Sequence, residues 1–235
     1  MRLLAGMRWP EVESSVVLVP VGSLEQHGPA LGLGTDALIA AQVTRRAASR
    51  LGGADASFVV APTVPYGASG EHEDFPGTIS IGHEALHLLL LELGRSACRW
   101  ARGVVLVNGH GGNVASLVSA VTQLRTEGRA VAWTSCRARD VDAHAGRAET
   151  SLLMALTPDG VARDQLVPGC TDPVASLMPR LRSVGVRAVS STGILGDPTT
   201  ATAQAGRRIL SEMVDRLVEE LTTLEVGAKG RLSWT

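Results

Sequence analysis

Aromatic side chains are scarce in this chain of 235 residues, and neither sign of charge is in excess. Phe, Trp and Tyr make up 3% of the residues, and 22 Lys and Arg are matched by 23 Asp and Glu. Proteins that bind nucleic acid usually carry a basic surface, often with aromatic side chains that stack on the bases. The composition therefore argues against nucleic acid as a partner.

Cysteine is scarce as well, and its three occurrences, Cys98, Cys136 and Cys170, lie far apart in the chain. A disulfide framework uses an even set of cysteines, and a thiolate zinc site uses closely spaced pairs. Neither pattern is present. We therefore expect three reduced thiols in a cytoplasmic protein.

Long apolar runs are also missing. The few apolar residues before Pro10 make too short a run for the core of a signal peptide. The most apolar helical stretch, residues 83–101, is interrupted by charged side chains, so we expect no membrane span and no membrane partner. With 45% hydrophobic residues the chain can still bury a large core, which predicts one domain over residues 1–235.

Strand-like and helix-like segments alternate through the first part of the chain. The strand-like segments are apolar throughout, which is typical of parallel strands buried on both faces. We therefore predict a three-layer α/β/α fold with a mostly parallel central sheet. The predicted strands are residues 16–21, 57–62, 103–107 and 130–134, and the predicted helices between them are 35–51, 83–100 and 113–127.

The second part of the chain is less regular. We predict a short helix over 145–156, then a stretch punctuated by proline to about residue 180, then a weak strand over 186–190. A final helix is predicted over 199–224, with Asp197 or Thr199 as its cap.

The loop after the first predicted strand carries Glu25, His27 and Asp36. Glu25 and His27 are two residues apart, so in an extended chain their side chains leave the same face. Two carboxylates and an imidazole suit a divalent cation such as Zn²⁺, Mn²⁺ or Fe²⁺. The alternative is a solvated Glu-x-His pair, with Asp36 as a helix cap.

The loops after the next two strands also carry polar side chains, among them Glu71, His72 and His110. In open α/β sheets, ligands bind outside the carboxyl ends of the strands, where these loops meet. His110 is flanked by glycines and has little apolar surface to pack against, which favours a ligand or a base. Free backbone N–H groups beside it offer an anion site instead, unless Asn113 caps the following helix.

A fourth cluster contains His144 and Glu149, just before and within the predicted short helix. Both side chains can face the carboxyl end of the sheet. The alternative for Glu149 is an exposed acid that the positive end of the helix dipole stabilises.

Four motifs, in this order and spacing, resemble the creatininase (creatinine amidohydrolase) family of metal-dependent amide hydrolases. The resemblance implies a creatininase-like fold and a homo-oligomer. It also implies two divalent ions per subunit, Zn, Fe or Mn, with Asp36 as a bridge; the implied ligands are Glu25, His27, Asp36 and His110. The motifs are PVGSLEQHGPALGLGTD, YGASGEHEDFPGTIS, VNGHGGN and DAHAGRAETS.

One position departs from the family pattern. Creatininase has an acid two residues after the histidine of its NGH motif, where this chain has Gly112. Glu149 is the expected substitute, either as a metal ligand or as the group that orients the attacking water. The resemblance implies that His144 shuttles protons. We expect Glu71 and His72 to contact the substrate; the alternative is a solvated turn or a subunit contact.

Three further stretches resemble one branch of the family, whose members remove a C-terminal Val-Tyr dipeptide from a small, enzymatically modified precursor peptide. We therefore predict a peptidase acting on such a peptide. An amidohydrolase of a small cyclic amide or formamide, such as creatinine or a formamidopyrimidine, is the alternative. A nucleotide- or flavin-binding module is disfavoured because no strand is followed by GxGxxG or a Walker lysine. The stretches are SGEHEDFPGTISIG, LRTEGR and GILGDPTTATAQAGRRI.

Overall fold

A four-stranded sheet forms the centre of the computed structural model, which describes residues 1–12, 15–52, 58–139 and 141–233. All strands of this sheet are parallel, in the order β2-β1-β3-β4. The predicted parallel sheet is confirmed; residue 57, at the start of the second predicted strand, lies outside the described residues. The strands are β1 (Val16–Val21), β2 (Phe58–Val60), β3 (Gly103–Asn108) and β4 (Val131–Ser135).

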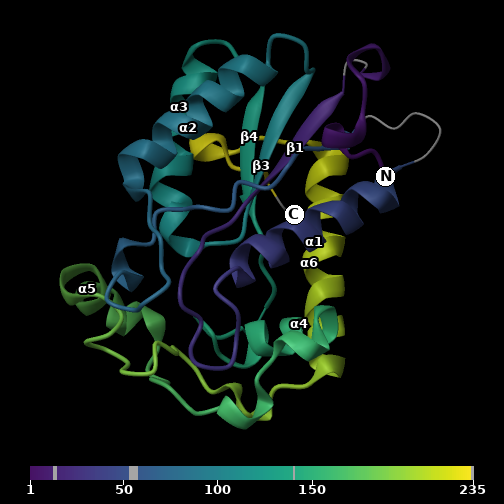
Figure 1. The fold of residues 1–235 in the computed structure, drawn as a ribbon. Coiled ribbons are helices and arrows are strands. Elements are labelled where there is room, and N and C mark those ends of the chain that lie inside the picture. Colours follow the sequence, from purple (N-terminus) through teal and green to yellow (C-terminus); the bar gives the residue numbers. More distant parts are fainter. Residues whose placement is uncertain (13–14, 53–57, 140, 234–235) are drawn as a thin grey trace.

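Helices cover both faces of the sheet, which confirms the predicted three-layer arrangement. Figure 1 shows α2 and α3 on one side of the strands and α1 and α6 on the other. No helix among the described residues combines the length and apolar character needed to cross a membrane. The helices are α1 (Thr35–Leu51), α2 (Gly82–Ala97), α3 (Val114–Thr126), α4 (Arg147–Leu156), α5 (Val174–Val184) and α6 (Ala203–Thr223).

Strand β1 explains why the apolar run is continuous. Its side chains alternate between two buried clusters: Val16 and Leu18 pack with α1 and α6, whereas Val17 and Val19 pack with α2 and α3. Successive residues of a strand point to opposite faces. A strand between two helical layers must therefore be apolar at every position.

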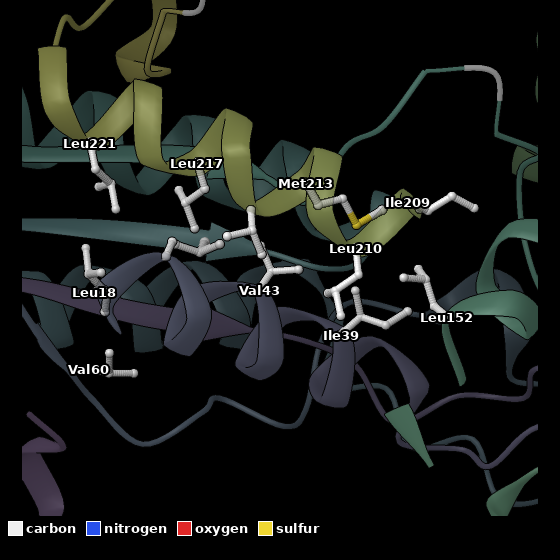
Figure 2. Close-up of a cluster of buried hydrophobic side chains, with 14 of the residues drawn as sticks. Leu18, Ile39, Val43, Val60, Leu152, Ile209, Leu210, Met213, Leu217 and Leu221 are labelled. Atoms are coloured by element: carbon white, nitrogen blue, oxygen red, sulfur yellow. The ribbon is translucent and has the colours of Figure 1, made fainter. Parts of the chain in front are cut away.

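Helix α6 holds α1 in place against the sheet. Met213 and Leu217 lie one turn apart on α6, and their side chains extend towards the layer that contains Val43 of α1 (Figure 2). Side chains four residues apart form one face of a helix, so a continuous apolar stripe of α6 is buried here. Because Asp36 lies in the first turn of α1, this packing also fixes the position of Asp36.

Several boundaries after residue 156 differ from the prediction. Helix α6 begins at Ala203, where Thr202 accepts a hydrogen bond from the Ala205 N–H at 3.1 Å. Asp197 instead caps a 3₁₀ turn, Pro198–Thr200. The predicted cap of the last helix was therefore wrong, because this turn intervenes.

The predicted strand over 186–190 was also wrong, since these residues form turns after α5. Helix α5 itself was not predicted. Pro173 is its N-cap, but Pro179 lies inside it, where proline normally disfavours a helix. Leu177 and Leu181 bury one face of α5, and this packing outweighs the local signal.

We expect Gly206→Ala to destabilise the fold by about 1–3 kcal/mol, the usual cost of overpacking. In an open helix the same change would stabilise by up to about 1 kcal/mol. Here α6 crosses α4 so closely that a Cβ on Gly206 would lie 1.8 Å from the Ser151 carbonyl oxygen. Chemical denaturation measures the effect, with Gly6→Ala as control because no neighbour lies within 4 Å of that Cβ. Unchanged stability of the Gly206 variant would contradict this close packing.

Candidate functional site

The site lies where β1 and β3 end. These strands are neighbours in the sheet, although the chain visits β2 between them. Such a reversal of strand order opens a crevice at the carboxyl ends of the strands. The loop after β1 carries Glu25 and His27, and the loop after β3 carries His110.

Asn113 ties three of the surrounding loops together. Its Oδ1 accepts from the Ala68 N–H at 2.9 Å, and its Nδ2 lies 2.9 Å from the Gly22 carbonyl oxygen and 3.1 Å from Asn108 Oδ1. The side chain makes no cap hydrogen bond to α3, so the suggested capping role was wrong. Because Asn113 is fully buried, these bonds fix the loops after β1, β2 and β3 relative to one another.

The four side chains predicted as metal ligands, Glu25, His27, Asp36 and His110, are all buried and close together. His27 Nε2 lies 3.2 Å from Asp36 Oδ1. His110 Nδ1 lies 3.1 Å from Glu25 Oε1 and 3.2 Å from Asp36 Oδ2. Among the described residues, those two carboxylate oxygens have no partner of hydrogen-bond geometry. Buried carboxylate oxygens without a partner are costly, so this donor set fits a cation.

The imidazoles are oriented as metal ligands usually are. His27 Nδ1 lies 3.1 Å from the Glu25 carbonyl oxygen, and His110 Nε2 lies 3.1 Å from the Ala68 carbonyl oxygen. A carbonyl only accepts, so each of these ring nitrogens carries the hydrogen. The other nitrogen of each ring faces the carboxylates. A backbone carbonyl behind the ring is the common second contact of a metal-bound histidine.

The pKa values of these groups reflect their mutual attraction. Burial lowers the pKa of His27, but the carboxylates of Asp36 and Glu149 outweigh it and raise the pKa to about 10. Burial raises the pKa of Glu25, but His110 holds it well below its usual value. Glu25 and Asp36, whose pKa values are both lowered, are therefore ionised, and positive charge is favoured between them. A divalent cation can supply that charge in place of protons.

His144 and Glu149 border the same cluster, as predicted. His144 Nδ1 lies 3.7 Å from Glu25 Oε1, and Glu149 Oε2 lies 3.7 Å from His27 Nε2. The Ala145 N–H also donates to Glu149 Oε2, at 2.6 Å. Burial, with His27 and His72 nearby, lowers the pKa of His144 to about 3, whereas burial raises that of Glu149 to about 7. His144 is therefore neutral near pH 7.

Three groups of three side chains among the described residues place ligand atoms within 4.8 Å of one another. They share residues, so together they describe one continuous cluster rather than separate sites. The groups are Glu25, His72 and His144; His27, His144 and Glu149; and Glu25, His27 and Asp36.

Glu71 and His72 lie on the loop after β2. His72 is buried, with Nε2 3.4 Å from Glu25 Oε1, whereas the Glu71 side chain is 31% exposed and its Oε1 lies 3.7 Å from His110 Nε2. A Cβ at Gly112 would lie 2.3 Å from the Ala68 carbonyl oxygen and 2.8 Å from Glu71 Oε1. An acidic side chain at position 112 therefore does not fit. The carboxylate of Glu71 lies next to Gly112 instead.

Gln26 was not singled out in the sequence, yet it contacts both flanking histidines. Its Oε1 accepts from the Gly28 N–H at 2.8 Å, which fixes the orientation of the amide. Its Nε2 donates to the Gly193 carbonyl oxygen at 3.0 Å and lies 2.9 Å from His72 Nδ1. His144 Nε2 is 2.9 Å from the Gln26 carbonyl oxygen, so that nitrogen carries the hydrogen. The free lone pairs are then Nδ1 of His144, facing the cluster, and Nδ1 of His72, facing Gln26.

We expect Gln26→Glu to reverse the tautomer of His72 and to lower kcat by about 10- to 100-fold, as changes behind metal ligands usually do. A carboxylate cannot donate, so the His72 proton moves to Nδ1. Nitrogen-15 NMR of the zinc-loaded protein reports the tautomer directly. Gln123→Glu, on an exposed face of α3, is the control. An unchanged His72 spectrum in the Gln26 variant would refute the assignment.

A cavity of about 210 Å³ opens onto this cluster. Asp36, His110, His144 and Glu149 line it, together with residues at and beyond the end of β4, among them Arg137. Position gives a partial signal for Gln26, which lies between two predicted ligands. The sequence contains no local signal that marks Arg137 as functional, because only the strand order brings Arg137 to this cavity.

Comparison with known proteins agrees with this geometry. Residues 5–221 match the family model described as Creatininase: Creatinine amidohydrolase. A mycofactocin precursor peptide peptidase of Mycolicibacterium smegmatis is 56% identical, over 93% of this chain and 89% of that protein. A creatinine amidohydrolase of Pseudomonas putida is 30% identical, over 92% of this chain and 94% of that protein.

The solved structures that resemble the fold include one described as Creatininase Mn. It superimposes with a TM-score of 0.80 at 28% identity, over 94% of this chain and 98% of that one. The family model and the relatives span nearly the whole sheet and every loop of the site. The chain belongs to the creatininase family.

Proposed function

We propose that this creatininase-family hydrolase is a metal-dependent peptidase that removes the C-terminal Val-Tyr dipeptide from a modified mycofactocin precursor peptide. The observation that carries the chemistry is the pair of unpartnered oxygens, Glu25 Oε1 and Asp36 Oδ2, which face one nitrogen of His110. The 56% identity to the Mycolicibacterium peptidase supports the substrate.

Glu25, His27, Asp36 and His110 are the proposed ligands of two divalent ions, Zn, Fe or Mn. The two oxygens of Asp36 face different imidazoles, Oδ1 towards His27 and Oδ2 towards His110, which suits a bridging role. Glu149 lies on the His27 side and can complete that shell. When bound, such ions polarise an amide carbonyl and make water a stronger nucleophile near neutral pH.

Proton transfer falls to His144 in this proposal. Its Nε2 hydrogen is held by the Gln26 carbonyl oxygen, so Nδ1 takes the proton from the attacking water. The same nitrogen then delivers that proton to the leaving amine, which must be protonated to depart. Glu149 either ligates a metal or orients the water. Glu71, which is partly exposed, and His72, which lies behind Glu25, are proposed to meet or position the peptide.

The deciding experiment offers metal-replete protein the modified precursor peptide, the unmodified peptide and creatinine, and follows the products by mass. Release of Val-Tyr from the modified peptide alone supports the proposal. Turnover of creatinine with both peptides untouched would favour a cyclic-amide hydrolase instead. Elemental analysis of protein purified without chelator should find one to two transition metal ions per subunit, and a metal-free protein of full activity would refute the metal role.

We also propose a homo-oligomer in the cytoplasm. Trp9, Ile79 and Leu88 are large apolar side chains that are exposed in the single chain, as residues of a subunit interface often are. Cys98, Cys136 and Cys170 are all free, which suits a reducing compartment. Sedimentation velocity at micromolar concentration measures the subunit number, and a monomer would contradict the first part.

A further inference from the structure

One permanent positive charge lines the cavity beside the proposed metal ligands. Of the described residues that surround this cavity, only Arg137 is a lysine or arginine. Asp142 also lines it, but both of its oxygens are used: they accept from the N–H groups of Arg147 and Ala148 at the start of α4. The other acids of the lining, Asp36 and Glu149, belong to the proposed metal centre, so no lining acid among the described residues is paired with Arg137.

The guanidinium of Arg137 has no ion pair or hydrogen bond to the described part of the chain. Arg137 is exposed on one side, and its partial burial lowers its pKa. The nearby guanidiniums of Arg231 and Arg216 lower the pKa further, whereas the carboxylate of Glu220 raises it. Both neighbours are engaged: Arg216 Nε lies 3.2 Å from Glu220 Oε1, and Arg231 lies over the Trp133 ring at 5.5 Å. Glu220, the acid near Arg137, is thus already paired with Arg216, and an anion in the cavity would complement the positive charge that remains.

The backbone fixes Arg137 relative to the reacting groups. The preceding residue, Cys136, donates its N–H to the Asn108 carbonyl oxygen at 2.8 Å. Asn108 ends β3, and His110 follows two residues later. The backbone of Arg137 is therefore held just after the end of β4, beside the loop that carries His110.

Release of a dipeptide requires the enzyme to select the second peptide bond from the C-terminus. Two extended residues span at most about 7 Å, so a group that binds the terminal carboxylate must lie in the same cavity as the reacting groups. Arginine suits this task because its planar guanidinium can hold both oxygens of a carboxylate and remains charged.

We infer that Arg137 binds the free α-carboxylate of the peptide substrate and thereby determines which bond is cut. This inference rests on the proposed peptidase function and deepens it, since it defines the substrate as a peptide with a free C-terminus. A peptide that ends in an amide lacks the charge that Arg137 recognises. It should bind in the same cavity with lower affinity.

The test compares the modified precursor peptide as free acid and as C-terminal amide. Wild-type protein should favour the acid by roughly 10- to 100-fold in kcat/KM, the usual worth of a hydrogen bond to a charged group. Arg137→Met should remove this preference, mainly through a higher KM for the acid, and Arg137→Lys should restore part of it. Arg139→Met, two residues away and outside this cavity, should keep the wild-type ratio. Circular dichroism and metal content verify that each variant folds.

A second measurement separates this inference from the proposed function. Calorimetry compares binding of free Val-Tyr and of its amide to wild-type and Arg137→Met protein. Selective binding of the acid, lost in the variant, supports the carboxylate site even if no peptide is cleaved, in which case only the proposed function falls. Equal binding and equal cleavage of acid and amide, or a ratio that Arg137→Met leaves unchanged, would overturn the inference.

Discussion

Replacement of Asp36 by alanine should remove most of the bound metal and lower kcat/KM by at least about 10³-fold, because several kcal/mol of transition-state stabilisation depend on the metal. Within the part of the chain that the structure describes, Asp36 is the one carboxylate whose two oxygens face two different imidazoles, those of His27 and His110. Its loss therefore affects both halves of the proposed centre. No other single substitution in the site should be as damaging.

Elemental analysis and peptide turnover, measured on the same preparation, test this expectation. The matched control is Glu84→Gln, because Glu84 also lies in the first turn of a helix but is exposed on α2. The control should keep its metal and its rate. An Asp36→Ala protein with normal metal content and normal turnover would exclude the bridge.

His144→Ala should lower kcat by about 10² to 10⁴, the usual contribution of a positioned acid or base, and should leave the metal content nearly unchanged. The ring is buried, with Nδ1 facing Glu25 and Nε2 held by the Gln26 carbonyl oxygen. That arrangement allows one nitrogen to exchange a proton. It gives the ring little freedom to do anything else.

The pH dependence separates proton transfer from metal binding. The rate profile should be bell-shaped. A neutral His144 accepts the proton, so activity should fall as the pH drops through its pKa. Because burial lowers that pKa to about 3, this acid limb should lie well below neutral pH, and His144→Ala should lack it. Loss of metal in the variant, with the acid limb retained, would instead make His144 a ligand.

Local patterns predicted much of the fold and most of the candidate site. Glu25, His27 and His110 follow continuous apolar strands. The carboxyl ends of parallel strands meet at one edge of the sheet, so the sequence alone predicts that these side chains lie close together. The spacing of two between Glu25 and His27 also predicted a shared face. Such signals depend only on neighbours along the chain.

Other parts depend on contacts between distant segments, which a single sequence does not reveal. The side-chain amide of Gln26 is held by a hydrogen bond to Gly193. The side chain of Asn113 is held by hydrogen bonds to backbone groups some 45 and 90 residues earlier in the chain. Helix α5 contains Pro179, and by local propensity a proline disfavours a helix. In each case a tertiary contact, and not the local preference, decides the outcome.

The strand order has an evolutionary consequence. The loops after the inner strands, β1 and β3, carry the proposed metal ligands Glu25, His27 and His110, whereas the loops after the outer strands carry Glu71 and Arg137. Mutations at the outer strands can thus accumulate without disturbing the inner pair. One family can in this way include members with different substrates: a 30% identical relative is named a creatinine amidohydrolase and a 56% identical one a mycofactocin precursor peptide peptidase. Relatives with different substrates should therefore differ mainly in the loops after the outer strands, β2 and β4.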